Sequence, residues 1–77
     1  MTLYFEDKNS KAKKIFEANE NLSNEDQSKE CYDEILRRCA DMGYKVYYLR
    51  SWETVFQEKE AIKVDFGSHS EFFYVVR

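Results

Sequence analysis

The chain has 77 residues, of which 43% are hydrophobic and 35% charged, with a formal net charge of −3 and no proline. This composition is typical of one small globular domain over residues 1–77 and excludes a disordered chain. Two cysteines are too few for a disulfide framework. No stretch approaches the ~20 apolar residues of a membrane span, so we expect no membrane association and a cytoplasmic location.

The first quarter of the chain predicts a strand followed by a short helix. Thr2–Glu6 alternates weakly, with Leu3 and Phe5 on one side, as in a short strand. A helix over Lys11–Asn21 is indicated by apolar and small residues at helical spacing, namely Ala12, Ile15, Phe16, Asn19 and Leu22. Three Asn and a Ser within residues 19–24 predict a break after this helix.

A second, longer helix is predicted from about Glu25 to Met42. Ser23 or Asn24 can cap its N-terminus, and Gly43 can end it as a left-handed C-terminal residue. Its apolar stripe consists of Cys31, Ile35, Cys39 and Met42. Two cysteines eight residues apart on one helix are separated by about 12 Å, too far for a disulfide, so we expect both to be reduced apolar residues.

After Gly43 the hydrophobic period changes to two, which predicts strands. Residues 44–49, 62–66 and 72–76 each alternate in this way. Ser51–Glu60 allows either a short helix capped by Ser51 or a hairpin arm turning at Glu58-Lys59, and we favour the strand or irregular interpretation. The expected fold is α+β in the order β-α-α-β-β-β, a small antiparallel sheet of three to four strands with two helices packed on one face.

Aromatic residues are concentrated in the predicted sheet, where nine of the thirteen rings fall in the last 34 residues. If Phe72, Tyr74 and Val76 face the helices, the opposite face shows Tyr47, Leu49, Lys63, Asp65, Phe73 and Val75. Such an apolar patch indicates a protein-binding surface, and we predict Tyr47, Trp52 and Phe73 as its main anchors. Two alternatives are that Trp52 and its neighbours fold over the patch, and that two copies pair through it as a homodimer.

Acidic residues are concentrated on the predicted helices, because residues 17–34 carry seven acids and one Lys. The simplest interpretation is a solvated helix face. The functional alternative is that Glu30, Asp33 and Glu34 steer the chain toward a basic partner, such as a host protein that handles nucleic acid.

Direct nucleic-acid binding is the alternative function. It would use the basic cluster Lys8, Lys11, Lys13 and Lys14 together with the aromatic sheet face. The sheet half of the chain, however, has no net charge and lacks an aromatic RNA-binding signature, which disfavours this function.

Catalysis is not indicated. The chain has one His, its cysteines lie on the apolar stripe, and no cluster has metal-ligand spacing. We therefore predict no enzyme activity, no catalytic residues, no metal and no cofactor.

A small, Pro-free protein rich in Lys, Glu, Asn, Tyr and Phe is similar in character to accessory proteins of bacteriophages and mobile elements. Many of those proteins inhibit a host enzyme or defence complex by binding it, so the resemblance implies an anti-defence role, anti-CRISPR activity included. It covers no specific residues. The leading hypothesis is a stoichiometric, non-enzymatic inhibitor or modulator of a host protein.

Overall fold

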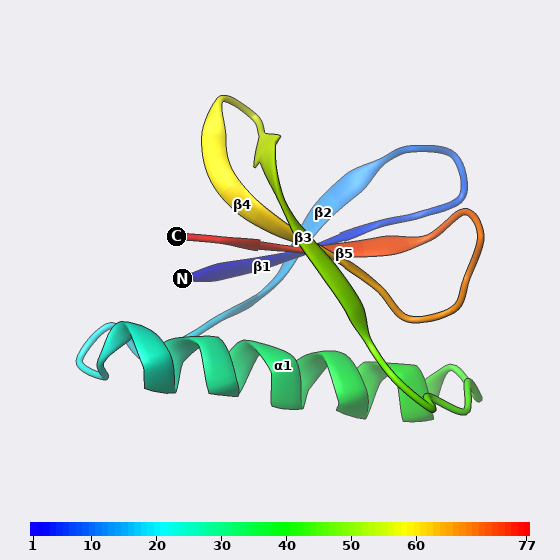
Figure 1. The fold of residues 1–77 in the computed structure, drawn as a ribbon, viewed down its shortest axis with the longest axis horizontal. Coiled ribbons are helices and arrows are strands. Elements are labelled where there is room, and N and C mark those ends of the chain that lie inside the picture. The colour runs from blue at the N-terminus through cyan, green and yellow to red at the C-terminus, as the bar shows by residue number, and fades with distance from the viewer.

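The strands of the computed structural model, which describes all 77 residues, form one sheet beside a single helix. The elements are β1 (Thr2–Glu6), β2 (Ala12–Glu17), α1 (Asn24–Asp41), β3 (Arg50–Phe56), β4 (Lys59–Asp65) and β5 (Phe72–Val76). The five strands lie in the order β2-β1-β5-β4-β3, and every neighbouring pair is antiparallel. Figure 1 shows the strongly twisted strands fanning out above α1, which covers one side of the sheet. The chain is an α+β fold, but the predicted β-α-α-β-β-β order with two helices and three to four strands is wrong.

The predicted first helix is strand β2. A tight turn precedes it, in which the Asp7 carboxylate accepts hydrogen bonds from the backbone N–H groups of Asn9 and Lys11 at 2.8 and 3.1 Å. The register between β1 and β2 then shifts opposite Leu3 and Tyr4, so that one residue, Ile15, is left over as a bulge. An extra residue breaks the two-residue period of a strand. It brings Ile15 and Phe16 onto the helix side together, and the resulting spacing imitates that of a helix.

The long helix is confirmed to within one residue at each end. The Ser23 hydroxyl caps α1 by accepting from the backbone N–H of Asp26 at 3.2 Å. Gly43, with φ of +80°, ends it, and the N–H groups of Gly43 and Tyr44 donate to the carbonyls of Ala40 and Cys39. This pair of bonds is a Schellman motif. No helix of the chain is both long and apolar enough to cross a membrane.

The segment after Gly43 is a loop and not a strand. Residues 44–49 have no ladder partner, and β3 begins only at Arg50. The ambiguous residues 51–60 form the β3–β4 hairpin, which confirms the strand interpretation. Its turn lies one residue earlier than expected, at Gln57 and Glu58, whose φ angles of +50° and +67° are the left-handed backbone conformation that a two-residue hairpin turn requires at both central positions.

The main core lies between α1 and the sheet. It consists of Leu3, Ala18, Cys31, Ile35, Cys39, Val64, Phe66, Phe73 and Val75. Phe73 is fully buried and Val75 is 3% exposed, so the prediction that both lie on the outward face is wrong. In the β4–β5 register Val64 lies opposite Phe73, and because opposite residues share a face, Phe73 points toward the helix.

A second, smaller core occupies the face without a helix. Here Phe56, Ala61, Tyr74 and Val76 are buried, and Tyr4 packs against them. The Phe56 ring lies 4.5 Å from Tyr74 and 4.8 Å from Tyr4, measured between centroids. Since β4 and β5 separate β3 from β1 in the sheet, this contact requires the sheet to curl. Part of the aromatic surplus is therefore covered within the chain, by Phe56 and not by the Trp52 that the sequence suggested.

Candidate protein-binding surface

Strand β3 forms an open edge of the sheet. Its seven residues pair with β4 in one continuous register, and its other side has no partner strand. A regular edge strand presents unpaired backbone N–H and C=O groups that can pair with an added strand. The opposite edge, β2, carries Lys13, Lys14 and the bulge at Ile15, features that discourage such pairing. Strand addition is therefore favoured at β3 over β2.

Apolar side chains are exposed on both faces of β3. Val55 is 70% exposed on the helix side, and Trp52 is 43% exposed on the face without a helix. The Lys63 ammonium lies 5.9 Å from the centroid of the Trp52 indole ring and 4.1 Å from the centroid of the Phe72 ring. A strand added to β3 would cover Val55 with one set of its side chains and Trp52 with the other.

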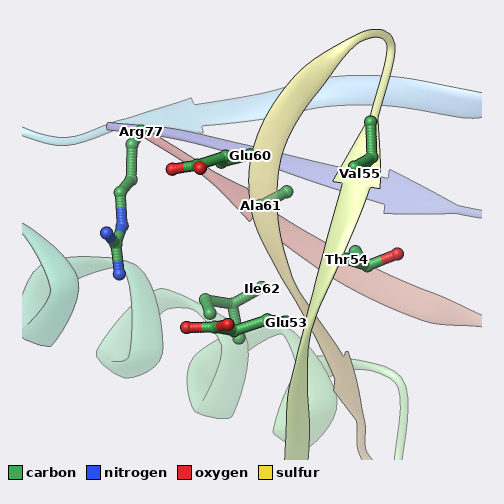
Figure 2. A pocket seen from close by; sticks show the side chains of 7 residues that line it. All are labelled: Glu53, Thr54, Val55, Glu60, Ala61, Ile62 and Arg77. Carbon is green, nitrogen blue, oxygen red and sulfur yellow. The ribbon is translucent and has the colours of Figure 1, made fainter.

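A groove runs along the helix side of the β3–β4 hairpin. Its volume is about 340 Å³, and it is lined by Glu53, Thr54, Val55, Glu60, Ala61, Ile62 and Arg77. Figure 2 shows the side chains of Glu53, Glu60 and Ile62 extending into the space between the hairpin and Arg77. All four ion pairs of the chain involve other residues, so these charged groups are free to interact with a ligand.

The predicted aromatic anchors are only partly available. Tyr47 is 86% exposed in the loop before β3, and Trp52 is accessible as described. Leu49 is half-buried against the main core, and the burial of Phe73 and Val75 prevents any contact with a partner while the chain is folded. The roles of Tyr47 and Trp52 stay predictions.

Two strongly exposed apolar residues on or just before β3 are not among the contacts predicted from the sequence. Tyr48, 70% exposed, lies in the segment 44–49, which was predicted to be a strand and is a loop. Val55 fell within the ambiguous segment 51–60. The alternation of Trp52, Thr54 and Phe56 with Glu53 and Val55 was the signal that could have identified it.

The acidic side chains proposed for steering are partly engaged. Glu34 accepts hydrogen bonds from the guanidinium groups of Arg37 and Arg38, the latter at 2.8 Å, and these bonds lower the pKa of Glu34. Glu30 accepts from the backbone N–H of Asn19 at 2.9 Å. Asp33 is exposed. The steering role of these acids stays a prediction, but the negative charge of Glu34 is already compensated by the two arginines beside it.

The basic cluster and Trp52 belong to opposite edge strands of the sheet. Lys8, Lys11, Lys13 and Lys14 are exposed at the β1–β2 turn and on β2, at the opposite edge of the sheet from β3. Three strands separate these edges in the sheet order, but the curl of the sheet packs Ala12 of β2 against the small core that contains Phe56 of β3. The nucleic-acid alternative therefore stays a prediction.

No protein-family model matches this sequence, and comparison with curated proteins and with solved structures gave no match. The fold is a small α+β domain, and of its two edge strands β3 exposes large apolar side chains, Trp52 and Val55.

Proposed function

We propose that this chain is a non-enzymatic protein-binding module that accepts an extended segment of its partner at the edge of β3. The observation that carries the proposal is the regular, unpaired edge with Val55 and Trp52 exposed on its two faces. Strand addition of this kind obtains affinity from main-chain hydrogen bonds and specificity from alternate side chains.

The exposed rings before β3 enlarge the contact. Covering the accessible parts of Val55 and Trp52 contributes about 1–2 kcal/mol each, whereas association costs about 4 kcal/mol or more. The edge alone is therefore insufficient for tight binding. Tyr47 and Tyr48, which lie in the same stretch of chain, supply further large apolar surface of the type that dominates interfaces.

The form of this function that we favour is stoichiometric inhibition or modulation of a host protein or defence complex. It is supported by the compositional resemblance to small phage and mobile-element proteins. A cytoplasmic location is part of the proposal, and it is supported by Cys31 and Cys39, two free thiols on one helix.

The test is capture of a partner protein with two variants, each of which replaces an exposed apolar residue with lysine. The tagged chain, Val55→Lys and Leu36→Lys are each exposed to nuclease-treated lysate of the source or host cell. Leu36, 45% exposed on α1, is the matched control, because its substitution adds the same charge away from β3. We expect one stoichiometric protein to be retained by the parent chain and by Leu36→Lys and lost by Val55→Lys. Backbone amides of β3 should gain hydrogen-exchange protection in the complex.

Several results would contradict the proposal. Equal retention by Val55→Lys would exclude the β3 edge as the contact. Retention of nucleic acid alone, in a lysate without nuclease, would replace the function with the alternative. A stable dimer of the chain that captures nothing would assign the exposed surface to self-assembly.

A further inference from the structure

We propose that the groove beside β3 selects a lysine or arginine of the partner segment, with its stem across Val55 and its charged end between Glu53 and Glu60. This inference rests on the proposed strand addition at β3 and names the chemistry of the added strand.

The register of the hairpin places these three side chains on one face. Glu53 lies opposite Ile62 and Val55 opposite Glu60 in the β3–β4 ladder, and opposite residues project to the same side. A partner residue opposite Val55 would project to that side too. Its neighbours would then be Val55 directly across and Glu53 two residues along β3, about 7 Å away.

The spacing of the strands requires a long side chain. Glu60 is on β4, so the partner backbone is two interstrand spacings away from it, roughly 10 Å. Only lysine and arginine combine that reach with an apolar stem, which can cover an exposed valine while the charge meets a carboxylate. Histidine and serine are too short to reach Glu60 across Val55.

The charges of the groove favour a cation. Glu53 and Glu60 contribute two negative charges, and Arg77 contributes one positive charge. The β4–β5 register places Arg77 beside Glu60, on the side away from β3, and no ion pair joins the two residues. A neighbouring groove of the helix side adds Glu25 from the first turn of α1. An acidic partner side chain would be repelled here, and a neutral one would leave both carboxylates without a counter-charge.

The floor of the groove makes the site more than a pair of acids. Ile62 lies beneath it on the helix side, and Val55 forms its edge next to the unpaired backbone of β3. An added strand would thus place the basic side chain over apolar surface and between the two carboxylates at the same time.

The experiment selects partners without assuming one. A random 12-residue peptide display library is selected on the parent chain, on Glu53→Gln/Glu60→Gln, and on Glu58→Gln. Glu58 is an exposed acid of the β3–β4 turn outside the groove, so its substitution controls for the loss of an acidic side chain elsewhere on the hairpin. Circular dichroism of each variant checks that it is folded before selection. We expect the parent chain and Glu58→Gln to enrich peptides that carry Lys or Arg within alternating apolar residues. The double variant should enrich strand-forming peptides without the basic residue.

An enriched peptide then gives the magnitude. Replacing its basic residue with Gln should weaken binding to the parent chain about threefold to tenfold, as for two solvent-accessible ion pairs. The same replacement should have little effect on binding to the double variant, and the difference should shrink as salt rises.

The outcomes separate the two proposals. Enriched strand-forming peptides without a basic preference would overturn this inference and leave strand addition intact. An equal basic preference on the double variant would also overturn it, because the groove would not be the cause. Absence of any enriched peptide, or binding that Val55→Lys does not reduce, would overturn strand addition and this inference together.

Discussion

Phe73 and Phe72 are adjacent in β5, yet their replacement by alanine should have very different effects. Phe73 is fully buried on the helix side, 5.1 Å from the rings of both Phe5 and Phe66. Phe72 is half-buried on the other face, beneath the Lys63 ammonium. The pair therefore tests which side of β5 packs against α1.

The expected magnitudes follow from burial. Removing a buried phenylalanine side chain costs about 3–5 kcal/mol. A chain of this length has a total free energy of unfolding of about 4–12 kcal/mol, so Phe73→Ala should remove a large part of it and, at the low end of that range, unfold the chain. Phe72→Ala should cost about 1–2 kcal/mol, since its ring is only partly buried.

Urea unfolding followed by circular dichroism measures both free energies. Phe73→Leu serves as a milder variant in case Phe73→Ala is unfolded. Its loss of about 1 kcal/mol should lower the Tm by roughly 4–8 °C. If Phe72→Ala proves more destabilising than Phe73→Ala, β5 faces the other way and the assignment of both cores is refuted.

Three further predictions concern α1 and its termini. Glu34→Gln should destabilise the chain at neutral pH and progressively less in acid. Hydrogen bonds from Arg37 and Arg38 lower the pKa of Glu34 in the folded state. The stability that Glu34 contributes is therefore present above its unfolded pKa of about 4.3 and is lost as the pH falls through the lower pKa of the folded state. Urea titrations of both proteins from neutral pH to about pH 3 check this, and a pH-independent difference would be evidence against it. Both thiols are fully buried, and burial raises the pKa of Cys31 and of Cys39, so a thiol reagent should modify them only as fast as the chain unfolds. Rapid modification of the native chain, followed by absorbance, would contradict their position in the core. Gly43→Ala should cost about 1–2 kcal/mol, because φ of +80° strains the backbone of any residue with a Cβ atom. The added methyl would meet no neighbouring atom, so backbone strain is the only cost expected. Thermal unfolding measures this loss, and an unchanged Tm would show that the left-handed residue is dispensable.

The long helix could be predicted from the sequence because several local signals agree there. The cap at Ser23, the apolar stripe through Ile35 and the terminal Gly43 each depend on residues close together in the chain. Strand β2 could not be predicted, because its alternation is interrupted by the bulge at Ile15, which exists only through pairing with β1. Bulges depend on a distant partner strand, and a local pattern does not contain that information.

The sequence of β5 also does not indicate which of its side chains face the helix. All five of its residues are apolar, because the strand is central and both of its faces are covered. Alternation carries no information when every position is apolar. The error on Phe73 follows directly, and with it the loss of two proposed contact residues. The role proposed for Glu60 and Val55, by contrast, depends on the hairpin register that places them opposite each other.

The position of β5 in the sheet also determines when the fold can form. β5 is the last strand in the chain, yet it lies at the centre of the sheet and joins the β1–β2 pair to the β3–β4 pair. Before residues 72–76 have left the ribosome, those two hairpins have no strand to connect them, and the nascent chain exposes the apolar faces that β5 will later cover. Its pairing with β1 brings together residues more than 65 positions apart, such as Tyr4 and Tyr74, a high-contact-order step that slows folding. Until that step is complete, a nascent chain is exposed to aggregation, and chaperone binding during synthesis should be strongest just before its final strand emerges.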